Sequence, residues 1–434
     1  MNKLILLLIG IILSNLSTLT YSETLSGIYS QAKRNDTKLL RLEIQRNAAF
    51  EAITSSRSDL LPEVNLTTDY NLSRSNQDRR DSDRLTASIN FSQKLYNRSS
   101  WITLNQAEKI AIQSDLYYKA AKQSLIIRVT KMYFDVLRAQ ENLEFIRLEN
   151  AAVTQQLKQT KHRFATGVAT ITDVYNAQAE YDRVIANEIL SANRLANQYE
   201  ELREITNQEN SNLNTLDTKL FSTNKITASV DLLIDEALQK NSALLATQVA
   251  QEIAKNNISL ANSRHLPSLT LNSRYSQRSE NNINFPHRNY NDFNIGLYLT
   301  VPLYSGGNIT SKTKQAELAY IIAGQELEAI YRNVTKSVRL LTNNINASIN
   351  ALYAHKQIVI SANSSLEATK SGFEVGTRTI LDVLHSRHHL YSAKKNLSNA
   401  RYDYILSVLK LRQVLGTLGE QDILDINSIL KLAK

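Results

Sequence analysis

One pattern of eleven residues occurs twice in the chain and limits how the chain can fold. The pattern, Phe-x-x-Gly-x-x-Thr-Ile-x-Asp-Val, occupies positions 164–174 and returns 209 positions later at 373–383. Each copy lies between long proline-free stretches whose apolar residues have helical spacing. Gly167 and Gly376 stand where a helix end favours positive φ, and a Thr three positions before an Asp has the spacing of a capping box. The sequence therefore predicts two tight turns, each joining two long antiparallel helices.

Other segments repeat in the same order and at nearly the same spacing. Leu61-Pro62 is echoed 205 positions later by Leu266-Pro267, and Leu95-Tyr96 is echoed 208 positions later by Leu303-Tyr304. A period of about two hundred residues is too long for a solenoid, whose repeats have about 20–50 residues. We therefore interpret the chain as an internal duplication.

Between these echoes the apolar residues change from helical spacing to alternation. Alternation places apolar residues on one face and polar residues on the other, which is typical of strands. The alternating segments are 64–73, 85–92, 269–276 and 293–301. We expect the polar segments Gln77–Asp83 and Gln277–Asn291 to be the loops of two β-hairpins. The pattern fits a transmembrane barrel and, equally, a soluble hairpin with one face on a core.

The rest of the chain is predicted to be helix with breaks, so the fold class is mostly α with a small β part. A stretch of about sixty-five residues spans ~95–100 Å as a helix, far more than a globular domain needs. In chain order we expect a helix at 23–60, a β-hairpin at 61–98, a long helical hairpin at 99–206, an equatorial linker at 207–230, a helix at 231–265, a second β-hairpin at 266–305, a second long helical hairpin at 306–416 and an equatorial closing segment at 417–434.

The N-terminus has the pattern of a secretory signal. Lys3 precedes an apolar run at 4–13, and polar residues follow as far as Ser22. The run is short for a bilayer span. We therefore expect a signal peptide at 1–22, with cleavage near Ser22-Glu23, and an uncleaved anchor is the alternative.

The composition argues against several classes of function. The chain has no cysteine, which removes disulfides, zinc–thiolate sites, thiol catalysis and lipid attachment through an N-terminal Cys. Its net charge of +9 is spread over interleaved acidic and basic residues, without the basic stripe and stacking aromatics of a nucleic-acid-binding protein. No nucleophile–base pair, glycine-rich phosphate loop or metal-ligand set is evident, so we expect neither an enzyme nor a cofactor.

The number of strands constrains assembly if the strands lie in lipid. Four strands cannot close a barrel, and an open edge in lipid leaves backbone groups unpaired. Two chains would reach the smallest known barrels of about eight strands, which their own side chains fill, whereas three chains would give about twelve strands and a polar lumen. Helices that continue from these strands would extend the closed wall as an α-helical tube.

Four stretches of the chain have the pattern of a known family: Gly376–Leu384, Asn343–Asn350, Val301–Gly307 and Ala400–Tyr404. Through these stretches the chain resembles the TolC outer-membrane channel family, over essentially its whole mature length. The resemblance implies a homotrimer with a 12-stranded β-barrel in the outer-membrane lipid and an α-barrel tunnel across the periplasm of a Gram-negative bacterium. It also implies a periplasmic adaptor protein and an inner-membrane pump of ABC, RND or MFS type as partners, in drug efflux or type I protein secretion, with no catalytic site.

Two other classes of protein stay open at this point. A periplasmic coiled-coil adaptor or structural protein would share the long helices, but it needs no lipid-facing strands. An enzyme is the third class, and the missing catalytic constellations argue against it.

The resemblance assigns roles to residues around the two turns. It implies that an iris of inner helices closes the periplasmic end, with Thr172 and Asp173 facing Phe373 and Arg378. A pair between Asp173 and Arg378 would be charge-assisted. The alternative is that Asp173 and Asp382 simply cap their helices, and the roles are compatible. Family members commonly have Tyr in place of Phe373, so one hydroxyl bond of the closing network is absent.

The resemblance further implies a ring of side chains, Asp382 and His385, that narrows the tunnel. A spacing of three places both residues on one helix face. Family members commonly have a second acidic residue where His385 stands, so the ring would be only half acidic at neutral pH. His385, His388 and His389 also suggest a metal site, but the His-Glu-x-x-His frame is missing, and a solvated or pore-lining face is favoured.

Overall fold

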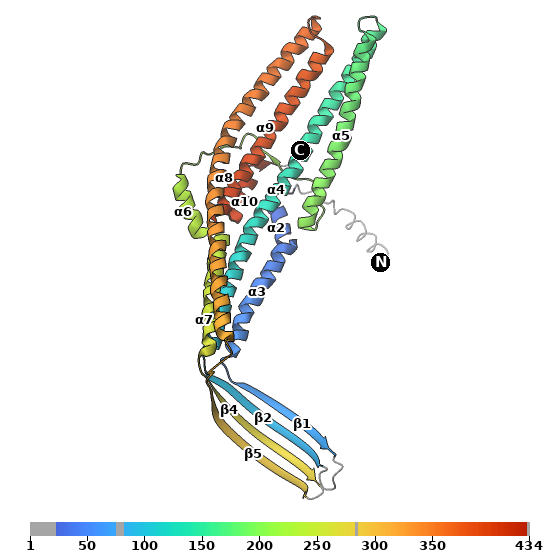
Figure 1. Ribbon diagram of the computed structural model, residues 1–434. Coiled ribbons are helices and arrows are strands. Elements are labelled where there is room, and N and C mark those ends of the chain that lie inside the picture. Colours follow the sequence, from blue (N-terminus) through green and yellow to red (C-terminus); the bar gives the residue numbers. More distant parts are fainter. Residues whose placement is uncertain (1–22, 75–81, 283–284, 432–434) are drawn as a thin grey trace, which may run out of the picture. The chain divides into compact units, whose positions relative to one another are not determined.

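The computed structural model describes residues 23–74, 82–282 and 285–431 (Figure 1). The segment expected to be a signal peptide, 1–22, therefore lies outside the described residues. The chain forms two compact units. Of the described residues, 23–40, 121–241 and 335–431 form the helical unit, and 41–74, 82–120, 242–282 and 285–334 form the sheet unit. Each unit draws on both halves of the sequence, as expected for an internal duplication.

Helices make up most of the described chain, which confirms the predicted fold class. They are α2 (Leu25–Asn35), α3 (Thr37–Ser58), α4 (Arg98–Ala165), α5 (Ile171–Thr206), α6 (Val230–Lys240), α7 (Ser242–Asn262), α8 (Asn308–Glu374), α9 (Ile380–Leu415) and α10 (Glu420–Ser428). α4 and α8, with 68 and 67 residues, pass through both units. Across the described ranges, we find no helix with both the length and the apolarity needed to span a membrane.

The helix expected at 23–60 is interrupted at Asp36, which separates α2 from α3. Its backbone leaves the helical region with ψ 110°, and its carboxylate accepts the Leu39 N–H at 2.7 Å. Arg128 of α4 donates two further hydrogen bonds to that carboxylate, at 2.8 and 2.9 Å. Asn241 makes the equivalent break between α6 and α7, and its amide donates to a backbone carbonyl of α9 at 2.8 Å. Apolar periodicity cannot reveal such breaks, because the deciding contact is polar.

The four expected strands form one antiparallel sheet. The strands are β1 (Glu63–Ser73), β2 (Ser82–Asn97), β4 (Ser268–Asn282) and β5 (Phe285–Thr300), in the order β1-β2-β4-β5 (Figure 1). The central pairing joins β2 of the first half to β4 of the second half, with Ile89 opposite Tyr275. β1 and β5 are the two edge strands of this sheet.

On the central strand β2, the polar side chains are buried and the apolar ones exposed, the opposite of a soluble sheet, whereas both faces of β1 are exposed. On β2, Leu85 and Ile89 are 47% and 50% exposed, whereas Thr86 and Ser88 are only 4% and 1% exposed. On β1, Leu66 is 73% exposed. A half-buried soluble sheet packs its apolar face on a core and leaves its polar face in water. Apolar residues outside and polar residues inside are instead the arrangement of a membrane barrel.

The second hairpin contradicts one expectation, because Gln277–Asn291 is not a loop. β4 and β5 continue through most of that polar segment. Polar side chains are paired across the strands there, with Glu280 opposite Arg288 and Arg84 of β2 3.4 Å from Glu280. The backbone ladder therefore continues where the apolar alternation stops. In the first hairpin, Ser82 and Asp83 belong to β2, and 75–81 lies outside the described residues.

Three aromatic side chains organise the core of the helical unit. Tyr133 and Phe134 of α4 and Tyr402 of α9 are fully buried, and the ring centroids of Phe134 and Tyr402 are 4.9 Å apart. The Tyr133 hydroxyl donates to the Asn214 carbonyl at 2.7 Å, which anchors the linker at 207–230. The linker and the closing segment lie side by side in a short antiparallel ribbon of β3 (Thr215–Leu216) and β6 (Leu430–Lys431).

The end of α9 offers a test of this packing at Gly416. Its φ is 77°, and a Cβ there would lie 2.2 Å from the Lys240 carbonyl oxygen. Gly416→Ala should cost at least about 3 kcal/mol, because left-handed strain adds to a clash with backbone atoms. Gly376→Ala is the matched control, since its φ is 80° but a Cβ would meet nothing within 4 Å. We expect thermal denaturation in detergent to show a much larger loss of melting temperature for Gly416→Ala. Equal losses would contradict the packing described.

Candidate functional site

The two predicted turns have the same backbone conformation. α4 ends at Ala165 and α5 begins at Ile171, while α8 ends at Glu374 and α9 begins at Ile380. Gly167 and Gly376 have φ values of 75° and 80°. In both turns the amide after the glycine donates to a carbonyl five residues earlier, at 2.8 Å. The predicted role of the two glycines is therefore confirmed.

Both predicted capping boxes are also present. Thr170 donates to Asp173 Oδ2 through its backbone N–H at 2.9 Å and its hydroxyl at 2.8 Å, and Thr379 does the same to Asp382 at 2.8 and 2.9 Å. In each box the Thr hydroxyl oxygen accepts the Asp backbone N–H. Hydrogen bonds from these threonines, chiefly from the backbone N–H and secondly from the hydroxyl, lower the pKa of Asp173 and of Asp382. Both carboxylates therefore stay charged at neutral pH.

The expected gating residues Asp173 and Arg378 are not joined within one chain. No hydrogen bond or ion pair between them occurs in the described residues, and the bonds of the Asp173 cap all use Oδ2. Arg378 is exposed, and its side chain folds back over Gly372, where a Cβ would lie 2.8 Å from the Arg378 Cγ. Thr172 is exposed as well. A contact between Asp173 and Arg378 thus stays a prediction about neighbouring copies of the chain.

Phe373, the fourth expected gating residue, contacts a partner that the sequence reasoning missed. The Arg163 guanidinium lies 5.0 Å from the centre of the Phe373 ring, a cation–π distance. Arg163 is in the last turn of α4 and Phe373 in the last turn of α8, so this contact joins the two helical hairpins. The only signal in the sequence was the position of Arg163 beside Phe164, the counterpart of Phe373.

An apolar cluster joins the same four helices just inside the turns. Its buried members are Val153, Val184, Leu366, Ile380, Val383, Leu384 and Leu390. Phe373 packs against this cluster, which takes side chains from α4, α5, α8 and α9. The two helical hairpins are therefore held together near their turns mainly by apolar packing.

The residues of the expected ring, Asp382 and His385, lie at the beginning of α9. Asp382 is half-buried and His385 is exposed. The charge of His385 helps lower the pKa of Asp382, and it also acts on Glu180 of α5. Within the described ranges, no group of three or more His, Cys, Asp or Glu side chains is arranged to hold a metal ion.

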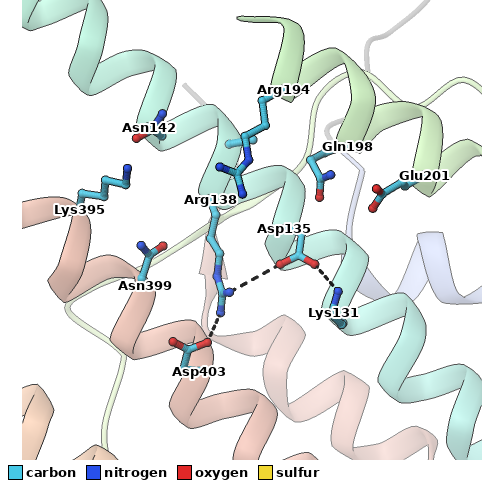
Figure 2. Close-up of a pocket in the computed structure, with 11 residues that line it drawn as sticks. Lys131, Asp135, Arg138, Asn142, Arg194, Gln198, Glu201, Lys395, Asn399 and Asp403 are labelled. Carbon is cyan, nitrogen blue, oxygen red and sulfur yellow. Dashed lines mark hydrogen bonds and ion pairs between the residues drawn. The ribbon is translucent and has the colours of Figure 1, made fainter. Parts of the chain in front are cut away.

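A polar groove of about 440 Å³ lies among α4, α5 and α9 (Figure 2). Arg138 crosses its floor, 2.6 Å from Asp403 and 3.6 Å from Asp135. Arg194 of α5 and Lys395 of α9 line the groove, and neither makes an ion pair within the described residues. The groove therefore offers positive charge that its own carboxylates do not neutralise.

Comparison with known proteins identifies the family. The model of a family described as outer membrane efflux protein matches residues 28–208 and 233–417. The chain belongs to this family. It is 58% identical over 437 residues to outer membrane protein TolC of Vibrio cholerae serotype O1, with 100% of both chains covered. It is 27% identical to alkaline protease secretion protein AprF of Pseudomonas aeruginosa, covering 98% of this chain and 90% of that protein.

Solved structures show the same fold. The Campylobacter jejuni CmeC outer membrane channel superposes with a TM-score of 0.81 at 16% identity, covering 96% of this chain and 92% of that chain. As a member of the outer membrane efflux protein family, the chain is an outer-membrane protein that acts as a transport conduit and not as an enzyme.

Proposed function

We propose that this chain forms the trimeric exit duct of an efflux or secretion system. The observation that carries the proposal is a four-stranded sheet with an apolar outer face and two open edges, β1 and β5. Each backbone group left unpaired in lipid costs about 2–7 kcal/mol, so the edges must be paired. In the proposed trimer, β1 of one copy pairs with β5 of the next, and twelve strands close around a polar lumen.

The helices continue the duct on the periplasmic side. The α4–α5 and α8–α9 hairpins of three copies form the wall of an α-barrel tunnel, and the two turns lie at its entrance. A periplasmic adaptor without a barrel is the alternative function. Such an adaptor would have no use for the exposed apolar face on β1 and β2.

The partners of the duct are a periplasmic adaptor protein and an inner-membrane pump of ABC, RND or MFS type. The family is that of the outer membrane efflux proteins, and its relative AprF is an alkaline protease secretion protein, so we assign both kinds of export to this type of duct. The groove in Figure 2 is the adaptor surface that we favour. There Arg194 and Lys395 offer unpaired positive charge to the carboxylates of an adaptor helix.

The entrance is closed in the resting state by links around the second turn. In the trimer, Arg378 of one copy binds Asp173 of its neighbour through the carboxylate oxygen that the cap leaves free. Thr172 and Phe373 line the same contact. The cap and the link are compatible, because the carboxylate has two oxygens and accepts several bonds.

Arg378→Ser tests the gate. Loss of the Asp173 link, worth about 1 kcal/mol per pair, should shift the closed entrance toward opening by roughly fivefold per link. We expect the conductance of the purified protein in planar bilayers to rise. Arg378→Lys, which keeps the charge but not the planar fork, should give a smaller rise. Unchanged conductance of an intact Arg378→Ser assembly would contradict the proposed link.

Asp382 and His385 form the proposed constriction ring, with three copies of each around the tunnel axis. An imidazole ordinarily titrates near pH ~6.5, so cation preference should fall as the pH drops from about 7.5 to 5.5. His385→Asp should strengthen cation preference and remove most of that pH dependence, because a carboxylate stays charged in this window. Reversal potentials in a salt gradient measure the effect. If wild type and His385→Asp are equally selective at both pH values, His385 does not line the tunnel.

A further inference from the structure

Glu149 connects three helices at the inner border of the apolar cluster. The side chain, on α4, is only 10% exposed. Its Oε1 atom lies 3.2 Å from Nη2 of Arg183 on α5 and 3.1 Å from Nδ1 of His388 on α9. One buried carboxylate oxygen thus contacts a cation of its own helical hairpin and an imidazole of the other hairpin.

Within the hydrogen-bonded group of Glu149, Arg183 and Glu180, the charges are not balanced when His388 is neutral. Arg183 also binds Glu180 of α5 with two bonds, at 2.8 and 2.6 Å, so one guanidinium serves two carboxylates. The bond from Arg183 lowers the pKa of Glu180, which keeps that carboxylate charged. Two negative charges and one positive charge leave a net charge of −1. A proton on His388 brings the group to zero.

Other charged groups near Glu149 do not duplicate the role of His388. Arg194 of α5 and Lys395 of α9 line the same hollow and are cations throughout the range of pH 5.5–7.5. A charge on His385 of α9 acts on Glu180 and on Asp382, and His385 makes no hydrogen bond with Glu149 within the described residues. Of the imidazoles in the described residues, His388 is the one within hydrogen-bond distance of Glu149.

The position of the contact links it to the gate. Glu149 is one helical turn before Val153, and His388 is one turn after Leu384, and both of these apolar residues belong to the cluster that joins the hairpins. An outward movement of α9 relative to α4 and α5 would separate Glu149 from His388. The contact can therefore exist only while the hairpins are together.

We propose that Glu149 is a further positioning residue for the closed entrance. Protonation of His388 strengthens the contact through which Glu149 holds α9 in place. The inference rests on the proposed function, since it concerns the opening of the same entrance. A protonated His388 can form an ion pair with Glu149 only while the hairpins are together. This ion pair therefore stabilises closure when His388 is protonated, and the contribution is lost when His388 is neutral.

The test measures the conductance of the intact wild-type assembly and its variants in planar bilayers at pH 7.5 and 5.5. Wild type should conduct less at pH 5.5, with a closed-to-open ratio roughly two- to fivefold higher per contact. His388→Gln, which stays neutral, should have at both pH values the closed-to-open ratio that wild type has at pH 7.5. His388→Lys, a permanent cation, should have at both pH values the ratio that wild type has at pH 5.5. Glu149→Gln should conduct more than wild type and lose most of the pH response.

His389→Gln is the matched control, because His389 is the exposed neighbour and makes no hydrogen bond or ion pair within the described residues. It should keep the wild-type pH response. A full pH response in His388→Gln overturns the inference, and so does loss of the pH response in His389→Gln. Arg378→Ser, measured in the same experiment, distinguishes failure of this inference from failure of the proposed function. If it opens the entrance while the Glu149 and His388 variants behave as wild type, the proposed function stands and this inference fails. If Arg378→Ser also has no effect, the proposed gate fails.

Discussion

The open edges of the four-stranded sheet are the constraint on which the rest of the structure depends. The strands expose apolar side chains outward and cover small polar ones such as Ser88, so the sheet suits lipid outside and water inside. Lipid offers no hydrogen bonds to the backbone of β1 and β5, so a single copy cannot be a stable end state there. The assembly of several copies that we propose would then follow from the backbone and need no special recognition sequence. In the proposed trimer, the long helices, which continue from the same strands, would inherit the symmetry of the closed sheet.

The internal duplication explains both the regularity and the asymmetry of the chain. The two turns, their glycines and their capping boxes are nearly superimposable copies. The contacts made by the copies differ, however. Phe373 packs on the apolar cluster under the Arg163 guanidinium, whereas its counterpart Phe164 is 44% exposed. Glu149 reaches His388, a contact with no counterpart at the equivalent positions. The two copies of the helical hairpin therefore form the proposed wall of the tunnel. The side-chain contacts that lack a counterpart in the other repeat are the ones that we propose to control the entrance.

Features with a local signal could be predicted from the sequence. Gly167 and Gly376, the two capping boxes and the alternating strands depend on residues a few positions apart, and all of them are present in the structure. Features decided by distant polar contacts could not be predicted. Asp36 breaks a helix because Arg128 lies opposite it, and the polar segment at 277–291 stays in strands because the neighbouring strands pair with it. The contacts of Glu149 with His388 and of Arg163 with Phe373 bridge different hairpins, and neither has a periodic pattern.

The central claim is that the sheet of one chain is completed by the sheets of other copies. Native mass spectrometry of the protein, extracted from the outer membrane in mild detergent, tests this claim most directly. The account predicts a complex of three chains that persists on dilution, because separation would expose the edges of β1 and β5. A single chain with its strands still folded would contradict the account, since the edges would then be stable without partners.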